Sequence, residues 1–238
     1  MGKRIISQRR GRGTRRFISL RHRYIGPARN KINLKNEVHT AEVVCLHHSP
    51  AHSAPLAHVV YDDGEEGLMI APEGIAVGDV ISTGKTSEIR PGNTLRLGDI
   101  PEGTAIYNIE NYKGDGGRYV RASGTAARVL ANMGQTVSVI LPSKKQKNFS
   151  ANCMATIGNV AGGGRLDKPM LKAGANWHAK RARGKLYPVT SAVAMNANEH
   201  PFGCGRGRHM GKPSIAPRYA PPGRKVGLIH PRRTGRRR

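Results

Sequence analysis

The hexapeptide Thr136-Val137-Ser138-Val139-Ile140-Leu141 carries the clearest secondary-structure signal in the chain. Val137, Val139 and Leu141 fall on one face of an extended backbone, and the three intervening side chains fall on the other. Valine, isoleucine and threonine also favour strands, because branched side chains fit a pleated surface. The hexapeptide therefore predicts a half-buried β-strand in a fold built from short strands.

Similar short apolar runs recur on both sides of this hexapeptide, separated by Gly, Pro and Asp. The predicted strands are residues 42–46, 57–61, 67–71, 78–82, 104–109, 119–121, 126–131, 136–141 and 152–157. Residues 62–66 join two of them in a hairpin. Short strands with turns at regular spacing are typical of small barrels and sandwiches. The predicted fold is mainly β, with an OB-fold-like barrel over residues 36–88 and an SH3-like barrel over residues 89–164.

The charged residues divide the 238-residue chain into three segments, whose boundaries differ from those of the two predicted barrels. Residues 1–35 contain twelve Lys/Arg and no acid, residues 36–115 contain four against thirteen acids, and residues 116–238 contain twenty-four against two, which gives a formal net charge of +25. Such a charge is the footprint of a polyanionic partner. The acidic middle segment argues against a polycation that binds anions without specificity. It indicates a folded module flanked by basic segments that enter the partner.

Residues 1–35 and 165–238 are predicted to be long, irregular, basic extensions. The first has too little apolar surface to offset its ordering entropy, so we expect it to be disordered without a counter-charge. A solubilising tail or a targeting signal is the alternative reading. In the second, Gly and Pro exclude long regular elements, although residues 171–185 could hold a short helix. The basic residues 232–238 mirror the start of the chain.

Residues 194–211 are predicted to be a long irregular loop, since they show no periodicity of helix or strand. Gly203, Gly205 and Gly207 let the backbone lie close against a partner. Arg206 and Arg208 supply charge-assisted hydrogen bonds to acidic oxygens. Long loops in compact domains are usually the working part, and the partner predicted here is a phosphate backbone.

RNA is the expected polyanion. Arginine, which pairs bidentately with phosphate and stacks on bases, predominates among the cations of the extensions. Irregular loops with the lone aromatics Trp177, Phe202 and Tyr219 suit folded RNA, whereas readers of duplex DNA usually present a helix or ribbon. The predicted RNA-binding residues are Arg9, Arg10, Arg12, Arg15, Arg16, Arg21, Arg23, Lys172, Trp177, Arg181, Arg183, Lys185, Met195, Asn196, His200, Arg206, Arg208, Lys212, Arg218 and Arg224.

Two groups of histidines and cysteines raise the question of a metal site. Cys45, His47, His48, His52 and His58 crowd one region, but no familiar zinc-ligand spacing is present and adjacent strand residues point to opposite faces. Surface histidines near RNA are the preferred reading, with zinc as the alternative, and no metal ligand is assigned. A second weak set is His200, Cys204 and His209. The three cysteines lie far apart, which fits a reducing compartment.

No catalytic residue is assigned either. Glu199, His200 and Cys204 formally offer an acid, a base and a nucleophile, yet a catalytic site needs a rigid supporting shell and this stretch has no evident core residues. Residues 203–207 lack the preceding strand and following helix of a nucleotide-binding glycine loop. No apolar run is long enough to span a membrane, and the N-terminus has no secretory pattern.

Several motifs, taken in order, resemble one family. They are residues 91–95 (Pro-Gly-Asn-Thr-Leu), 123–125 (Ser-Gly-Thr), 153–158 (Cys-Met-Ala-Thr-Ile-Gly), 172–175 with Trp177, and 195–203 (Met-Asn-Ala-Asn-Glu-His-Pro-Phe-Gly). Together they resemble the universal large-ribosomal-subunit protein two in its archaeal form, over nearly the whole chain. One departure is Ser191-Ala192, where that family usually has Arg-Gly, and it puts any RNA contact at these two positions in doubt.

The resemblance implies the same pair of barrels and a structural role in the cytoplasmic large ribosomal subunit. The expected partners are large-subunit rRNA and neighbouring ribosomal proteins, with the small subunit and tRNA indirectly, at one copy per ribosome. The expected roles are assembly of the peptidyl-transferase region, tRNA placement and subunit association, with His200 architectural, no protein cofactor, and Mg²⁺ only through rRNA. The acidic residues 62–66 should face solvent or a protein neighbour. The alternative function is a free OB/SH3-type RNA or DNA chaperone or chromatin protein.

Overall fold

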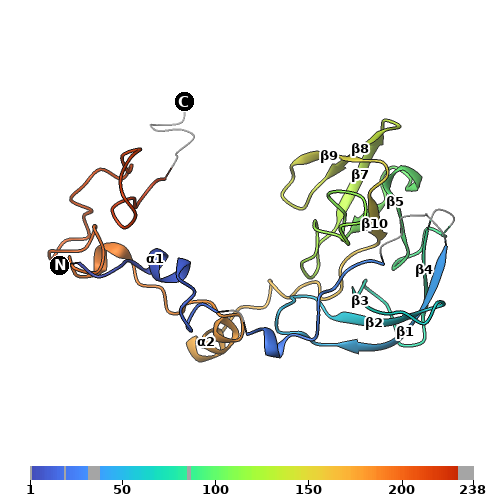
Figure 1. Ribbon diagram of the computed structural model, residues 1–238, viewed down its shortest axis with the longest axis horizontal. Helices are drawn as coiled ribbons and strands as arrows, with labels where there is room; N and C mark the ends of the chain where they lie inside the picture. The colour runs from blue at the N-terminus through green and yellow to red at the C-terminus, as the bar shows by residue number, and fades with distance from the viewer. Residues whose placement is uncertain (1, 19, 32–37, 85–86, 230–238) are drawn as a thin grey trace. The chain divides into compact units, whose positions relative to one another are not determined.

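The chain divides into two compact units (Figure 1). The computed structural model describes residues 2–18, 20–31, 38–84 and 87–229. One unit, here called the β unit, comprises residues 21–169, and the other, here called the basic unit, combines residues 1–20 with residues 170–238. The basic residues 232–238 that mirror the start of the chain lie outside the described residues.

Four antiparallel strands form the first half of the β unit. They are β1 (His39–His47), β2 (Leu56–Tyr61), β3 (Glu66–Ile70) and β4 (Val80–Thr83), in the order β3-β2-β1-β4. Alternate side chains of β1 and β2 point inward, so that Val43 and Val59 are fully buried and pack with Met69 and Ile81. This half therefore has a core of its own.

Six further strands form the second half. They are β5 (Thr94–Arg96), β6 (Ala105–Tyr107), β7 (Ala127–Asn132), β8 (Thr136–Ile140), β9 (Gln146–Ser150) and β10 (Met154–Ile157), in the order β5-β10-β6-β7-β8-β9. A short 3₁₀ helix, η2 (Leu97–Asp99), follows β5. Val137 and Val139 of β8 are fully buried in the core of this half together with Phe149 of β9, as the alternation of the hexapeptide predicts.

A single parallel pair, Thr83 beside Thr94, links the halves into one ten-stranded sheet. A third apolar cluster joins them as well, and it contains Leu56 and Ile70 from the first half and Tyr107 from the second. The Tyr107 hydroxyl donates to the Ile70 carbonyl at 3.0 Å. Burial raises the pKa of Tyr107, so the hydroxyl keeps the proton that this bond needs.

The segment before β1 is packed into the β unit. Ala28 and Asn30 are buried, and the Asn30 side chain donates to Thr156 Oγ1 at 3.3 Å and accepts from Asn108 Nδ2 at 2.7 Å. These bonds tie residues 28–30 to the second half of the sheet. The division at residue 35 stays a prediction, although these residues already belong to the β unit.

Glu110 is a buried carboxylate, only 1% exposed, at the end of the turn after β6. One carboxylate oxygen accepts from Gly116 N at 3.2 Å, and the other accepts from Gly114 N at 3.2 Å and Met154 N at 2.9 Å. A buried charge is tolerated only when hydrogen bonds replace its hydration. Glu110 therefore fixes the turn of residues 114–116 against β10.

The mainly β prediction is confirmed, and eight of the predicted strands overlap strands of the sheet. The predicted strand at residues 119–121 is wrong: this segment makes only an isolated bridge from Tyr119 to Ile109, and Val120 adopts a φ of 55° that no strand allows. Two strands were not predicted, β5 and β9. β9 is polar apart from Phe149, and β5 is three residues long, so neither leaves a periodic signal.

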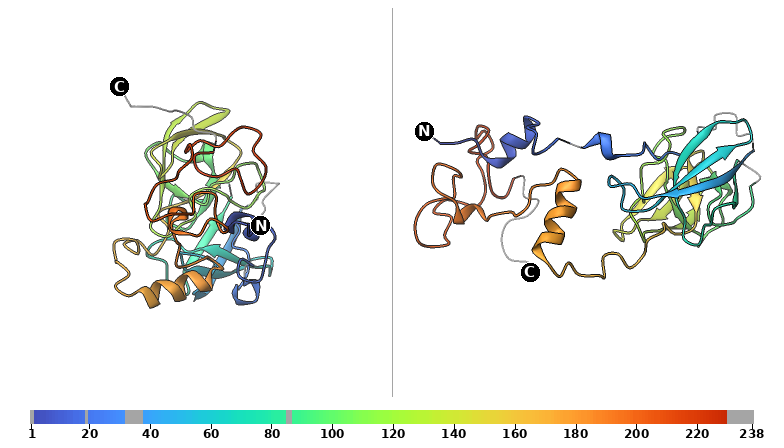
Figure 2. Two further views of the ribbon diagram at one scale, coloured as in Figure 1. Left: turned by 90° about the vertical axis from the view of Figure 1, so that its left-hand side faces the viewer. Right: turned by 90° about the horizontal axis from the view of Figure 1, so that it is seen from below.

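The basic unit is largely irregular (Figure 2). It contains α1 (Ile6–Gly11), which was not predicted, α2 (Ala173–Ala182), which corresponds to the helix considered within residues 171–185, and η3 (Ala192–Ala194). Turns and bends make up most of the rest. Among its described residues, Ile5 and Phe202 are the only buried apolar side chains. None of the helices in the described ranges is long and apolar enough to cross a membrane.

Candidate nucleic-acid interface

The basic unit holds nearly all of the excess positive charge. Counted on the sequence, residues 1–20 and 170–238 contain 23 Lys/Arg and one acid, whereas residues 21–169 contain 17 Lys/Arg and 14 acids. The two units thus carry +22 and +3. Within the described part of the basic unit, the one ion pair joins Lys3 to Glu199 at 3.3 Å. The remaining cations are not neutralised by acids of the unit itself, and an external anion is required.

The structure leaves the side chains of the predicted RNA-binding set accessible. Met195 and His200 are half-buried, and the other eighteen are exposed. Eighteen members of the set lie in the basic unit, whereas Arg21 and Arg23 lie in the short 3₁₀ helix η1 (Arg21–Arg23) of the β unit. Exposed guanidinium groups without acidic partners can donate bidentate hydrogen bonds to phosphate oxygens.

Helix α2 presents Trp177 and Arg181 as a stacked pair. The Arg181 guanidinium carbon lies 5.0 Å from the centroid of the Trp177 ring, and the helix buries none of its side chains. A helix with no buried face gains little from its own unit and needs an outside surface. Both side chains can stack on unpaired bases, as the sequence predicts for Trp177.

Residues 195–211 are irregular, as predicted for the loop of residues 194–211, but residues 195–203 within it form a tight turn whose internal hydrogen bonds the sequence did not reveal. The Asn196 carbonyl accepts from the backbone of Glu199 at 3.0 Å and of His200 at 3.2 Å, and Gly203 N donates to the His200 carbonyl at 2.9 Å. Phe202 is 8% exposed. The expectations that this stretch lacks core residues and that Phe202 is an accessible aromatic are therefore wrong, whereas Tyr219 and Trp177 are exposed.

His200 acts within this loop as an acceptor. Its Nδ1 accepts a hydrogen bond from the backbone N–H of Phe202 at 3.1 Å, and its ring lies 5.3 Å from the Phe202 ring. Partial burial lowers the pKa of His200 below its usual 6.5. The neutral ring that this bond requires is therefore the form present at neutral pH, which agrees with an architectural role.

We expect the Phe202 amide to report the titration of His200. Because the folded pKa is lowered, the bond persists as pH falls to 6.5 and is lost as pH falls further through the folded pKa. An NMR titration of the ¹⁵N-labelled chain should show the His200 ring and the Phe202 amide shifting with one midpoint below 6.5. In His200→Asn the acid-dependent shift of Phe202 should vanish. A midpoint above 6.5 would contradict the assignment.

Residues 2–8 lie against the loop of residues 197–200 (Figure 1). Lys3 N donates to the Asn198 carbonyl at 2.6 Å, next to the Lys3–Glu199 ion pair. A cavity of about 450 Å³ opens here. Its basic lining residues are Lys3, Arg4, His200, Lys212 and Arg224. The last three belong to the predicted RNA-binding set, whereas Lys3 and Arg4 do not, because their only signal in the sequence is their place in a basic block.

The acidic tip between β2 and β3 is paired within the β unit. Asp63 forms an ion pair with Lys31, and Asp62 accepts from Thr40 N at 3.2 Å and lies 3.3 Å from His39 Nδ1. The Thr40 amide lowers the pKa of Asp62, and the hydrogen bond from Lys31 lowers the pKa of Asp63. Both carboxylates therefore stay ionised, and their orientation toward solvent or a protein neighbour stays a prediction.

The histidine group near Cys45 is divided by the fold. Cys45, His47 and His58 converge on one face of β1 and β2, whereas His48 is exposed and His52 hydrogen-bonds to Ser49 Oγ at 3.1 Å. Strand β1 ends at His47, so strand alternation does not apply to His48; the three side chains that converge come from residues two apart on β1 and from a cross-strand partner on β2. His200, Cys204 and His209 do not form such a group among the described residues.

Taken together, a β unit with two cores and a basic unit with 23 Lys/Arg against a single acid define a polyanion-binding protein. Two family models match the sequence: "Ribosomal Proteins L2, RNA binding N-terminal domain" over residues 2–83, and "Ribosomal Proteins L2, C-terminal domain" over residues 90–219. The chain belongs to the ribosomal protein L2 family, a family of ribosomal structural proteins and not of enzymes.

Archaeal relatives match along the full length. The chain is 49% identical over 243 residues to the large ribosomal subunit protein uL2 of Methanocaldococcus jannaschii, and 49% identical over 238 residues to that of Archaeoglobus fulgidus, with 100% of each chain covered in both cases. It is also 49% identical over 236 residues to the Natronomonas pharaonis protein of the same name, covering 99% of this chain and 97% of the relative. These matches confirm the resemblance noted from the motifs.

Proposed function

We propose that this protein is a structural constituent of the large ribosomal subunit, where it binds large-subunit rRNA in the cytoplasm. The family membership and the name of the archaeal relatives support this role. The position of His200 is compatible with an architectural role, because its Nδ1 accepts a hydrogen bond from the backbone N–H of Phe202 within the loop. The β unit would supply a rigid folded body, and the basic unit would follow the RNA.

One observation carries the proposal: the basic unit has a charge of +22 and, in its described part, two buried apolar side chains. Burial of two side chains stabilises by roughly 3–6 kcal/mol, at about 1.5–3 kcal/mol each. Ordering a single residue costs about 1–2 kcal/mol of backbone entropy. A unit of this length therefore cannot be held by its own core, and a phosphate-rich scaffold would supply the missing free energy.

The exposed arginines and lysines of the predicted set would contact phosphate, and Trp177 would stack on a base. If roughly ten of them neutralise phosphates, the logarithm of the affinity should fall with the logarithm of salt with a slope of roughly −7 to −9. Contacts at Ser191-Ala192, where the family usually has Arg-Gly, are not part of the proposal.

We also propose contacts with other components of the ribosome. Neighbouring ribosomal proteins would meet parts of the β unit other than Arg21 and Arg23, because its near-balanced charge of +3 attracts phosphate less strongly than the +22 of the basic unit does. The small subunit and tRNA would be reached indirectly, through the rRNA that the protein holds in place, with one copy per ribosome. Mg²⁺ would enter with the rRNA, and no protein-bound cofactor is needed for this role.

Sedimentation of a cell lysate through a sucrose gradient after a high-salt wash tests the proposal. We expect the protein to migrate with large subunits. It would dissociate slowly, because many phosphate contacts hold it and folded rRNA surrounds its basic unit. Release of the protein into the soluble fraction would instead support a free RNA or DNA chaperone or chromatin protein. Turnover of any substrate by the purified chain, lost in His200→Ala, would support an enzyme.

The double substitution Arg206→Ala with Arg208→Ala should weaken rRNA binding and flatten its salt dependence. Each lost phosphate contact reduces the magnitude of the slope by about 0.7–0.9, so the pair should reduce it by roughly 1.5. Filter binding of the full chain to a large-subunit rRNA fragment at several salt concentrations measures this. Arg90→Ala is the control, because Arg90 is exposed in the β unit and already pairs with Glu88 at 2.7 Å. An unchanged slope in the double variant would contradict the assignment.

A further inference from the structure

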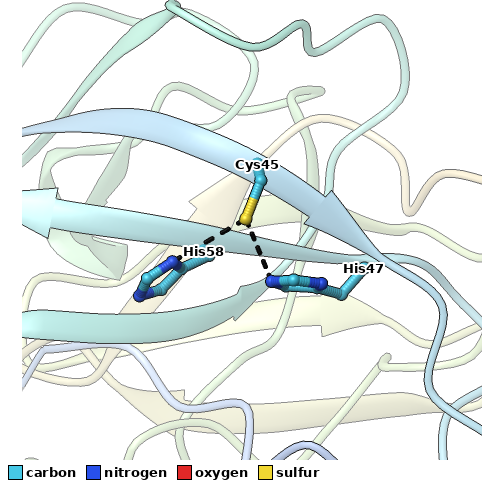
Figure 3. Close-up of side chains that lie close together, drawn as sticks. All are labelled: Cys45, His47 and His58. Carbon is cyan, nitrogen blue, oxygen red and sulfur yellow. Dashed lines mark hydrogen bonds between the residues drawn. The ribbon is translucent and has the colours of Figure 1, made fainter.

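Three metal-binding side chains meet on the first half of the β unit (Figure 3). Cys45 Sγ lies 3.0 Å from His47 Nε2 and 3.8 Å from His58 Nδ1. The three donor atoms all lie within 4.8 Å of one another, and each of the side chains is half-buried. Both histidines turn a ring nitrogen toward the sulfur (Figure 3).

A β-bulge creates this convergence. In the upper part of the β1–β2 ladder Val43 stands opposite Val59, but the register then shifts by one, so that Cys45 stands opposite His58. Without the shift Cys45 would face Ala57. His47 lies two residues beyond Cys45 on the same strand, where alternation returns it to the same face. Bulges commonly re-aim side chains at functional sites.

The spacing of the donor atoms fits a tetrahedral ion. A zinc ion bound at about 2.3 Å from sulfur and about 2.0–2.1 Å from nitrogen would separate sulfur and nitrogen by roughly 3.5 Å. The two observed sulfur–nitrogen distances, 3.0 and 3.8 Å, lie on either side of this value. Small adjustments of side-chain torsions would therefore complete the geometry without movement of the strands.

Glu66 prepares His58 for this role. Its carboxylate Oε2 lies 3.1 Å from His58 Nε2, the ring nitrogen that faces away from Cys45. A carboxylate at that position accepts a hydrogen bond from Nε2–H and leaves the lone pair of Nδ1 directed at the cluster, as in carboxylate–histidine–zinc triads. Glu66 lies on β3, so three neighbouring strands contribute to the arrangement.

The cluster is also open to solvent. His47 and His58 line a cavity of about 610 Å³, together with Glu65, Glu66 and the segment of residues 25–31. An ion could enter through this cavity and keep a water molecule as its fourth ligand. Two cations, Arg29 and Lys31, also line the cavity, and Lys31 is paired with Asp63 and Glu65, so its charge is offset.

We propose that Cys45, His47 and His58 form a binding site for a zinc-class divalent ion, with the fourth position open to water. Thiolate and imidazole are the ligands that such an ion prefers. Binding would transfer the thiol proton of Cys45 to solvent and form one metal–sulfur and two metal–nitrogen bonds. The site would cross-link β1 to β2 at the bulge, where the ladder is interrupted.

Cobalt(II) is the probe for the test, because its spectrum reports both the ligand type and the geometry. Untagged full-length chain is stripped with a chelator and titrated with Co²⁺, and then with Zn²⁺ as competitor. We expect one equivalent to bind, with a thiolate-to-cobalt charge-transfer band and intense tetrahedral d–d bands, and Zn²⁺ to abolish both. Saturation without a thiolate band would overturn the proposal.

Variants separate this site from unspecific binding. Cys45→Ser should abolish the charge-transfer band and weaken binding by at least 100-fold, and Glu66→Gln should weaken it by roughly 10–100-fold through the second shell. His48→Ala and Cys204→Ser are matched controls, since both side chains are exposed and outside the cluster, and they should bind as the parent does. Circular dichroism establishes that each variant is folded. Full binding by folded Cys45→Ser, or no binding by the parent chain, would refute the site.

Discussion

Replacing Glu110 by alanine is expected to bring the β unit close to unfolding. The substitution leaves the backbone N–H groups of Gly116 and Met154, which are buried, and of Gly114, which is half-buried, without their acceptor. Each unsatisfied donor costs about 1–3 kcal/mol, so the sum is roughly 3–9 kcal/mol, reduced where water can enter. The whole stability of a domain is typically about 5–15 kcal/mol. The expected loss is therefore a large fraction of the total.

Two further variants sharpen this prediction. Glu110→Gln keeps one acceptor oxygen but turns an NH₂ group toward at least one of the three donors, so its loss of stability should be intermediate. Glu102→Ala is the control, because Glu102 accepts a single backbone bond, from Asn132 N at 2.9 Å, at an exposed site. We expect it to lose less than about 1 kcal/mol.

Urea denaturation of the full chain, followed by far-ultraviolet circular dichroism, measures the free energy of unfolding in these variants. Hydrogen exchange of peptides from β6 and β10 should locate the loss in the β unit and spare α2. Equal urea midpoints for Glu110→Ala and Glu102→Ala would show that the three hydrogen bonds of the Glu110 carboxylate do not stabilise the β unit.

The substitution Gly203→Ala should disable the loop of residues 195–203. An added Cβ would lie 2.3 Å from the Asn196 carbonyl oxygen and 2.5 Å from that of Met195, and both are backbone atoms that cannot swing aside. The loop must open, at a cost of about 3 kcal/mol for the rearranged backbone. If rRNA binds the loop as it is folded here, affinity should fall roughly 100-fold.

Two other glycines provide graded controls for this loop. Gly205 has a φ of 89° but open space around it, so Gly205→Ala should cost only the strain of a left-handed residue, about 1–2 kcal/mol. Gly174 lies in α2 with open space and a normal φ, and alanine there should favour the helix by about 1 kcal/mol. Filter binding to the rRNA fragment should rank the affinities Gly174→Ala, then Gly205→Ala, then Gly203→Ala. Equal affinities would contradict the loop assignment.

The strands with a clear period of two could be predicted from the sequence, and they define the sheet. Val137 and Val139 are buried as their alternation requires. β9 could not be predicted, because only Phe149 of its five residues is buried and the strand exists through pairing with β8. Residues 119–121 read as a strand from their composition, but Val120 takes a left-handed turn that composition does not encode.

The sequence predicts which residues the candidate RNA interface contains, but it does not predict how they are arranged in space. Charge counting identified the exposed arginines, since a cation in a block without acids has no internal partner. It could not show that Phe202 folds inward or that Lys3 reaches residues 198 and 199, because both contacts are long-range. Likewise, the convergence of Cys45 with His58 depends on a one-residue register shift, which leaves no trace in local sequence.

The pairing of Lys3 with Glu199 sets an order of events during synthesis of the protein. These residues are 196 positions apart, and at about 5–20 residues per second the second is made roughly 10–40 s after the first. Through that interval Lys3 and the neighbouring arginines of α1 are present without residues 198 and 199, which Lys3 contacts in the folded unit. During synthesis the basic N-terminal segment can therefore bind other nucleic acids or chaperones. Although it is translated first, it is among the last segments to pack into the folded protein.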